Sequence, residues 1–129
     1  MSGRVLLDTH ALVWWLLDDD RLSVGGDRAI RAASEVLVSA ATAWEVTTKA
    51  RLGKWPEAEA LAADLLTWVR RQGMHTLDVT FEHGQRAGRL PGAHRDPFDR
   101  LLIAQCHAEQ VPIVSADAVF DGYGVAQIW

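Results

Sequence analysis

The most informative stretch of this sequence is Val5-Leu6-Leu7-Asp8-Thr9-His10-Ala11-Leu12-Val13. Its first three residues are all apolar, which is typical of a short strand buried on both faces. Asp8 ends this strand, and the residues from Thr9 to Leu17 favour a helix. We therefore expect a strand followed at once by a helix, with an acid at the junction.

Similar units follow along the chain. Buried strands are predicted at 36–39, 74–79 and 111–115, and an edge strand at 125–129. Turn residues at 23–26 are expected to close the first unit, and helices are predicted at 27–34, 42–52, 56–73, 80–89 and from Asp96 onward. Apolar strands separated by helices indicate an α/β fold with a central parallel sheet flanked by helices on both faces. The 129 residues contain no repeat or linker, so a single domain, 1–129, is expected.

Composition places the chain among ordinary globular proteins, with 49% hydrophobic and 23% charged residues. The longest apolar run, 11–17, is too short to span a bilayer, and the N-terminal residues do not resemble a signal peptide. We therefore expect a cytoplasmic protein without membrane contact. The single cysteine, Cys106, cannot form an internal disulfide and is predicted to be a core thiol.

The net charge of -4 argues against a protein that coats duplex nucleic acid with a broad basic face. It does not exclude RNA as a substrate. A nuclease can concentrate acids in a metal site and keep basic residues at its rim, and several of the arginines and lysines of this chain come in local groups.

Four acids are placed at strand ends or at the helix starts that follow them. Asp8 ends the first strand, and Asp117 follows the fourth strand. Glu45 is predicted in the first turn of the helix after the second strand, and Asp99 in the first turn of the Asp96 helix. Because sites in parallel sheets lie beyond the carboxyl ends of the strands, we expect these side chains to meet at one edge.

Each acid also has a structural explanation. Asp8 and Asp117 suit turns or helix N-caps, Asp99 suits the positive end of a helix, and Asp96 before Pro97 suits an N-cap. In addition, Thr42-x-x-Glu45 matches a capping box. These explanations account for each acid separately but not for their coincidence.

Carboxylates crowded together repel one another unless a cation lies between them. Oxygen ligands without a matching set of cysteines or histidines favour Mg²⁺ or Mn²⁺ over zinc. Such an ion can activate water for attack on a phosphodiester and stabilise the leaving oxygen. The acids therefore predict metal-dependent hydrolysis without a protein nucleophile.

Four blocks of this sequence, in this order, resemble the signature of PIN-domain ribonucleases of the VapC toxin type. The blocks are Leu7-Asp8-Thr9-His10; Trp44-Glu45 with Lys49-Ala50-Arg51-Leu52-Gly53-Lys54; His94-Arg95-Asp96-Pro97-Phe98-Asp99-Arg100-Leu101-Leu102; and Ser115-Ala116-Asp117. The resemblance implies a PIN-like α/β fold, Mg²⁺-dependent endoribonuclease activity with Mn²⁺ as a substitute, and a homodimer. It also implies inhibition by a VapB-type antitoxin.

The resemblance also assigns residues by motif position. The catalytic and metal-binding acids it implies are Asp8, Glu45, Asp99 and Asp117. Hydroxyl support comes from Thr9 and Ser115, and Asp96 is a supporting acid.

The adjacent tryptophans Trp14 and Trp15 point in different directions on one helix. Either one of them is exposed, as a partner surface or a base-stacking platform, or both are buried in a two-sided layer. We expect them to form an antitoxin-binding groove, together with apolar residues of the first and third helices: Val13, Trp44, Val46 and Ala50. The partner segment should be rich in aromatic and basic residues, so that an arginine can pair with the acids.

Three other functions compete with this one. His10 or His94 would suit acid–base cleavage of RNA, but no histidine pair has convincing spacing. A haloacid-dehalogenase-like phosphatase needs a second aspartate two residues after Asp8, where this chain has His10. A non-catalytic PIN-like or receiver-like module would tolerate loss of acids, and this chain keeps all four. Mg²⁺-dependent cleavage of single-stranded RNA separates the nuclease from the last two.

Overall fold

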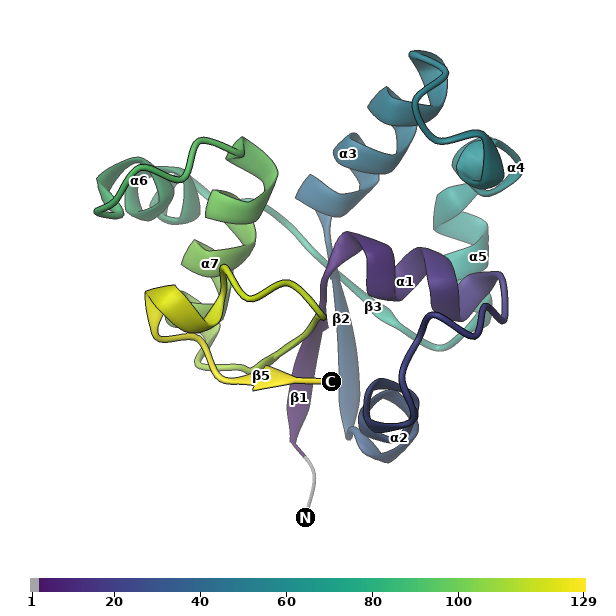
Figure 1. Ribbon diagram of the computed structural model, residues 1–129, viewed down its shortest axis with the longest axis horizontal. Coiled ribbons are helices and arrows are strands. Elements are labelled where there is room, and N and C mark those ends of the chain that lie inside the picture. The colour runs from purple at the N-terminus through teal and green to yellow at the C-terminus, as the bar shows by residue number, and fades with distance from the viewer. Residues whose placement is uncertain (1–2) are drawn as a thin grey trace.

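The computed structural model describes residues 3–129, and its centre is a parallel sheet of five strands (Figure 1). The strand order is β3-β2-β1-β4-β5, and every neighbouring pair is parallel. The strands are β1 (Arg4–Leu7), β2 (Glu35–Ser39), β3 (His75–Leu77), β4 (Ile113–Val114) and β5 (Gln127–Ile128). The α/β architecture predicted from the apolar strands is confirmed.

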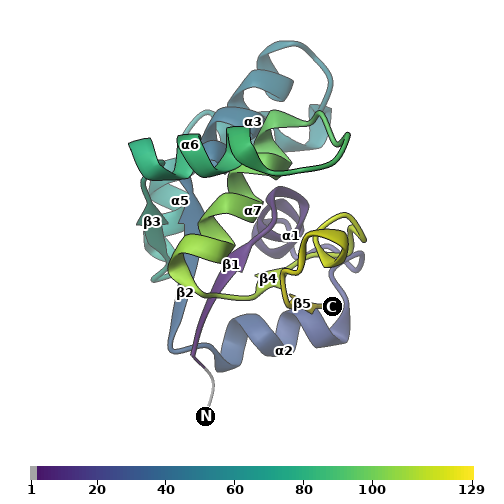
Figure 2. The ribbon, with the colours of Figure 1, turned by 90° about the vertical axis from the view of Figure 1, so that its left-hand side faces the viewer.

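Helices cover both faces of the sheet. In Figure 1, α6 and α7 lie on one side of the sheet and α1 to α5 lie on the opposite side. Figure 2 turns the side with α6 and α7 toward the viewer. The helices are α1 (Thr9–Leu16), α2 (Val24–Ala32), α3 (Ala40–Arg51), α4 (Glu59–Ala62), α5 (Leu65–Arg71), α6 (Phe81–Arg89) and α7 (Pro97–Glu109), with short 3-10 turns η1 (Pro56–Ala58) and η2 (Asp121–Tyr123).

Alternate residues of each strand enter two separate cores. In β1, Leu7 packs with α1 and with the helices on that side, whereas Leu6 packs with α7 on the other. In β2, Val38 lies in the same core as Leu7, and Leu37 lies in the same core as Leu6. This two-sided burial explains why the strands are apolar throughout. Among residues 3–129 every helix is too short or too polar to traverse a lipid bilayer.

Helix α3 begins earlier than the sequence predicts. Ser39, the last residue of β2, is its N-cap, and the Ser39 hydroxyl accepts a hydrogen bond from the Ala41 N–H at 3.0 Å. The capping box expected between Thr42 and Glu45 is therefore wrong, because both residues lie inside the helix. Glu45 consequently sits in the second turn rather than the first.

Two other boundaries differ from the prediction. The turn expected at 23–26 is the start of α2, since the Ser23 hydroxyl accepts from the Gly26 N–H. The helix expected from Pro56 to Gly73 is divided into η1, α4 and α5, and Asp64, at φ -149° and ψ 43°, leaves the helical conformation between α4 and α5.

The start of α2 lies against the last residue of the chain. A Cβ atom at Gly25 would lie 2.5 Å from the Trp129 carbonyl oxygen, so only glycine permits this approach. We expect Gly25→Ala to lower the free energy of unfolding by about 1–3 kcal/mol, because the backbone of Trp129 must move.

The matched control is Gly84→Ala, an exposed position in α6 where an added Cβ would meet nothing within 4 Å. Alanine there should stabilise the helix by up to about 1 kcal/mol. Urea unfolding of both variants measures the difference. Equal stability of the Gly25→Ala variant and the wild type would contradict the close packing.

Candidate active site

Asp8 is fixed at the junction of β1 and α1. One carboxylate oxygen, Oδ1, accepts from the Thr9 N–H at 2.8 Å, and the other, Oδ2, accepts from the Ser115 hydroxyl at 2.7 Å. The side chain is buried, and this burial raises its pKa against the lowering effect of the Ser115 hydrogen bond. Asp8 is therefore held rigidly, in a position where its charge is poorly solvated.

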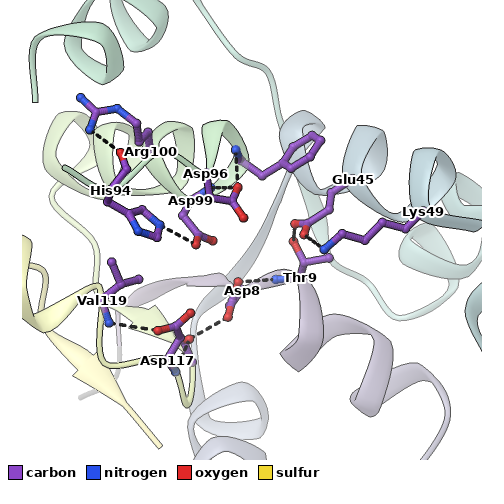
Figure 3. Close-up of polar contacts among 12 residues, drawn as sticks. Asp8, Thr9, Glu45, Lys49, His94, Asp96, Asp99, Arg100, Asp117 and Val119 are labelled. Carbon is purple, nitrogen blue, oxygen red and sulfur yellow. Dashed lines mark hydrogen bonds and ion pairs between the residues drawn. The ribbon is translucent and has the colours of Figure 1, made fainter. Parts of the chain in front are cut away.

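Asp99 lies in the first turn of α7, and its carboxylate points toward Asp8 and Asp117 (Figure 3). The helix is capped by Asp96, whose Oδ1 accepts from the N–H groups of Phe98 and Asp99. Burial is the main cause that raises the pKa of Asp99 to about 6. The charges of Asp96, Asp8 and Asp117 raise it further, while a 2.9 Å contact between Asp99 Oδ2 and His94 Nε2 opposes the shift.

Asp117 follows β4 in a tight turn beside Asp8. Its N–H donates to the Ser115 hydroxyl at 3.0 Å, and its Oδ1 accepts from the Val119 N–H. From β5, the Gln127 amide donates to the carbonyl oxygens of Ser115 and Asp117. The Ser115 hydroxyl thus donates to one acid and accepts from the backbone of another, so it links Asp8 and Asp117 directly.

Glu45 joins this group through Thr9 (Figure 3). Glu45 is 4% exposed, and its Oε1 accepts from the Thr9 hydroxyl at 2.7 Å. Its other oxygen pairs with the Lys49 ammonium one helical turn later. The structure therefore gathers Asp8, Asp99 and Asp117 in the centre and sets Glu45 beside them with both oxygens engaged.

The PIN domain family matches residues 5–125 of this chain. The chain belongs to the PIN-domain family. Ribonuclease VapC22 of Mycobacterium tuberculosis is 34% identical to it over 103 residues, which cover 78% of this chain and 76% of that protein. The predicted resemblance to the VapC type of PIN domain is confirmed.

Solved structures share the fold at low sequence identity. The DNA-bound VapBC of Salmonella typhimurium superposes with a TM-score of 0.71 at 16% identity, covering 98% of this chain and 97% of that chain. VapBC2 of Rickettsia felis, bound to a promoter DNA fragment, gives 0.68 at 14% identity and covers 96% of both chains. VapC20 of Mycobacterium tuberculosis, a sarcin–ricin loop cleaving toxin, gives 0.67 at 19% identity, covering 95% and 96%.

The acids of this PIN domain suit a hard divalent cation in their chemistry. All of their donors are carboxylate oxygens, and their crowding leaves local negative charge, as the effect of Asp8 and Asp117 on the pKa of Asp99 indicates. Among residues 3–129, no three side chains of His, Cys, Asp or Glu are already placed closely enough to hold an ion. The donor chemistry thus fits Mg²⁺, while the spacing of these side chains among residues 3–129 does not match a closed metal site.

Several residues that shape the site were not predicted from the sequence. The guanidinium of Arg100 donates to the carbonyl oxygens of Ala87, Leu90 and His94, so it ties the segment before α7 to the helix. This clamp holds His94 next to Asp99. The other unpredicted contributors are Thr42, Lys49 and Gln127. Lys49 and Arg100 lie in the quoted blocks, and the spacing of four residues between Glu45 and Lys49 was a signal for their ion pair.

The aromatic groove expected from the sequence needs correction. Val13 and Val46 are completely buried in the core, so they cannot form a binding surface. Trp14 and Trp15 are half-buried, and Trp44, at 56% exposed, packs edge-on against Phe98.

The single cysteine lies in the core, as predicted. Cys106 is 3% exposed and packs among the apolar residues between the sheet and α7. Burial raises the pKa of its thiol to about 12, so the thiol is neutral and unreactive at ordinary pH.

Asp99→Asn is expected to stabilise the metal-free protein at neutral pH. The pKa of Asp99 is raised from 3.8 to about 6, so between these values the folded state keeps a proton that the unfolded chain has lost. Wild-type stability therefore falls as the pH rises through this window. After allowance for solvent screening, the free energy of unfolding of the asparagine variant should exceed that of the wild type by about 1–2 kcal/mol at pH values above this window.

Urea unfolding with EDTA at about pH 4 and about pH 7.5 measures this gain, which should be present only at the higher pH. Asp78→Asn, at an exposed position outside the site, is the control and should show no such gain. If the Asp99→Asn variant is no more stable than the wild type at the higher pH, the ionised Asp99 carboxylate does not destabilise the fold, which would contradict the raised pKa.

Proposed function

We propose that this PIN domain is the endoribonuclease toxin of a VapBC-type pair, and that it hydrolyses RNA with Mg²⁺ held by Asp8, Asp99 and Asp117. Mn²⁺ is the expected substitute. The observation that carries this proposal is the convergence of three carboxylates from separate segments, in a chain 34% identical to a ribonuclease. Asp8 is buried, Asp99 is half-buried and Asp117 is exposed to solvent. Clustered acids of this kind are unfavourable unless a cation offsets their repulsion.

When bound, Mg²⁺ supplies a Lewis acid that polarises the phosphodiester and lowers the pKa of a water. The protein's own part is to hold the carboxylates in position. Ser115 fixes Asp8 and Asp117 relative to each other, and His94 orients one oxygen of Asp99. With its pKa at about 6, Asp99 is mostly ionised at neutral pH and available to a cation.

Glu45 has a different place in this proposal. Its pairing with Lys49 neutralises it, so it supports the site through Thr9 in the structure described here. It becomes a metal ligand, as the sequence resemblance implies, only after release of Lys49. The freed ammonium, on a side chain that is 34% exposed, would then be available to an RNA phosphate.

Cleavage of single-stranded RNA should require both the metal and the acids. Asp8→Asn and Asp99→Asn should each lower the rate at least about a hundredfold, because each loses the charge that holds the cation. EDTA should abolish activity, Mg²⁺ or Mn²⁺ should restore it, and Ca²⁺ should bind with little turnover. The measurement is a gel assay on end-labelled RNA.

The Asp78→Asn variant is the control and should keep wild-type activity. Cleavage that persists in EDTA would instead favour a histidine mechanism through His94 or His10. A protein that cleaves no RNA with any divalent ion would favour a non-catalytic module.

We propose that the partner is a VapB-type antitoxin bound beside α1. A cavity of about 550 Å³ is bordered by Trp14 and Trp15. Four aspartates also line it, Asp18, Asp19, Asp20 and Asp27, against the single basic residue Arg31. This lining suits an aromatic and basic peptide segment. The VapBC complexes among the structural neighbours support a partner of this type.

The homodimer and the cytoplasmic location stay predictions. Sedimentation velocity tests the homodimer.

The product of the neighbouring gene should form a tight, inactive complex with this protein. Trp15→Ala should weaken the complex more than tenfold, because a buried aromatic anchor contributes about 2 kcal/mol or more. Trp68→Ala on α5, a site 37% exposed, is the matched control and should bind normally. Unchanged affinity of the Trp15→Ala variant, measured by calorimetry, would show that the antitoxin binds elsewhere.

A further inference from the structure

A second, smaller cavity opens directly from the acidic site. Its volume is about 260 Å³. Its lining includes the acids Asp8 and Asp117 and the aromatic residues His10, Trp14 and Trp129. Pockets for drug-sized molecules measure roughly 300–1,000 Å³, so this cavity has room for a single ring system. Two carboxylates of the proposed metal site are therefore also walls of an aromatic pocket.

The aromatic wall is already formed in the structure. The ring centroids of Trp14 and Trp129 are 5.8 Å apart with planes inclined at 56°, and those of His10 and Trp14 are 5.4 Å apart. Two backbone contacts hold Trp129 in place. Its carbonyl lies against Gly25, and the carbonyl oxygen of the preceding residue, Ile128, accepts a hydrogen bond from the N–H of Ser115, just after β4. Its ring is nevertheless 38% exposed. A fixed and accessible indole ring is a suitable stacking platform.

Trp14 contributes its ring to this wall. Its indole Nε1 is buried and has no hydrogen-bond partner within residues 3–129. Because that nitrogen is closed off from solvent, the N–H does not face the open cavity. A ligand in the cavity can therefore contact the Trp14 ring but cannot accept a hydrogen bond from its N–H.

We propose that this cavity receives one nucleobase of the RNA substrate, next to the phosphate that is cut, and that the base stacks on Trp129. The inference rests on the proposed ribonuclease function and extends it to substrate selection. A base is flat and uncharged, so it can lie against the aromatic residues of this cavity without competing with the metal and the phosphate for Asp8 and Asp117. Single-stranded RNA is recognised chiefly through such splayed bases on aromatic side chains.

The test compares Trp129→Ala with Trp68→Ala, whose wild-type side chains are 38% and 37% exposed. Each variant cleaves a randomised RNA pool with Mg²⁺, and the product ends are sequenced. Trp129→Ala should lose about tenfold in kcat/KM and relax the base preference at one position flanking the cut, because stacking on that ring is lost. Trp68→Ala should change neither.

Two further substrates and variants sharpen the comparison. An abasic site at the flanking position should make wild type and Trp129→Ala equally fast, whereas Trp129→Phe should recover most of the activity on the normal substrate. Where Trp129→Ala fails to fold, Trp129→Leu keeps the apolar volume without the flat ring.

Identical rates and product ends for the Trp129 variants and the wild type would overturn the proposal. So would a loss of antitoxin affinity without any effect on RNA, because the pocket would then be a protein interface.

Failure of the nuclease function itself gives a separate result. If the wild type cleaves no RNA, the four ribonucleoside monophosphates are added to the Mg²⁺-loaded protein, and its indole N–H resonances are followed by NMR. The signals of Trp14 and Trp129 should shift while that of Trp68 stays in place. Absence of a shift with all four nucleotides would overturn the pocket proposal independently.

Discussion

Loss of hydration at two acids is the constraint on which the rest of this structure depends. Burial raises the pKa of Asp8 and of Asp99, and the charges of Asp8 and Asp117 raise that of Asp99 further, although the three residues are attached to different segments. The fold tolerates this arrangement because hydrogen-bond donors surround the acids. Ser115 bonds to Asp8, Thr9 donates its backbone N–H to the same residue, and helix dipoles point their positive ends at the site. The two-sided core then keeps the strand ends in register.

The architecture was predictable because its signals are local. Each buried strand is a short apolar run, and the acids that follow β1 and β4 are adjacent to those runs in the sequence. Parallel pairing brings such positions together whatever the intervening residues are. Asp8 and Asp117 could therefore be predicted to converge on one edge of the sheet, and α7 brings Asp99 near enough for their charges to act on it.

The contacts around the acids depend on tertiary structure and were harder to predict from the sequence. Arg100 could not be recognised as a clamp, because its acceptors are backbone carbonyls whose position follows from the packing of α6 on α7. Glu45 was misplaced by one turn, because Ser39 caps α3 before Thr42 can. The burial of Val13 and Val46 depends on how many layers cover that face of the sheet, which the helical periodicity of a single segment does not reveal.

The hydrogen bond between Ser115 and Asp8 joins residues 107 positions apart. Contacts between residues so distant in sequence form late, because most of the chain must be ordered before the two meet. A growing chain contains β1 through α3 before β4 is made, so it carries Asp8 and Glu45 without Ser115 or Asp117. Its acidic centre is incomplete at that stage. The order of segments along this chain therefore delays the assembly of the centre until residues 115–117 have been added.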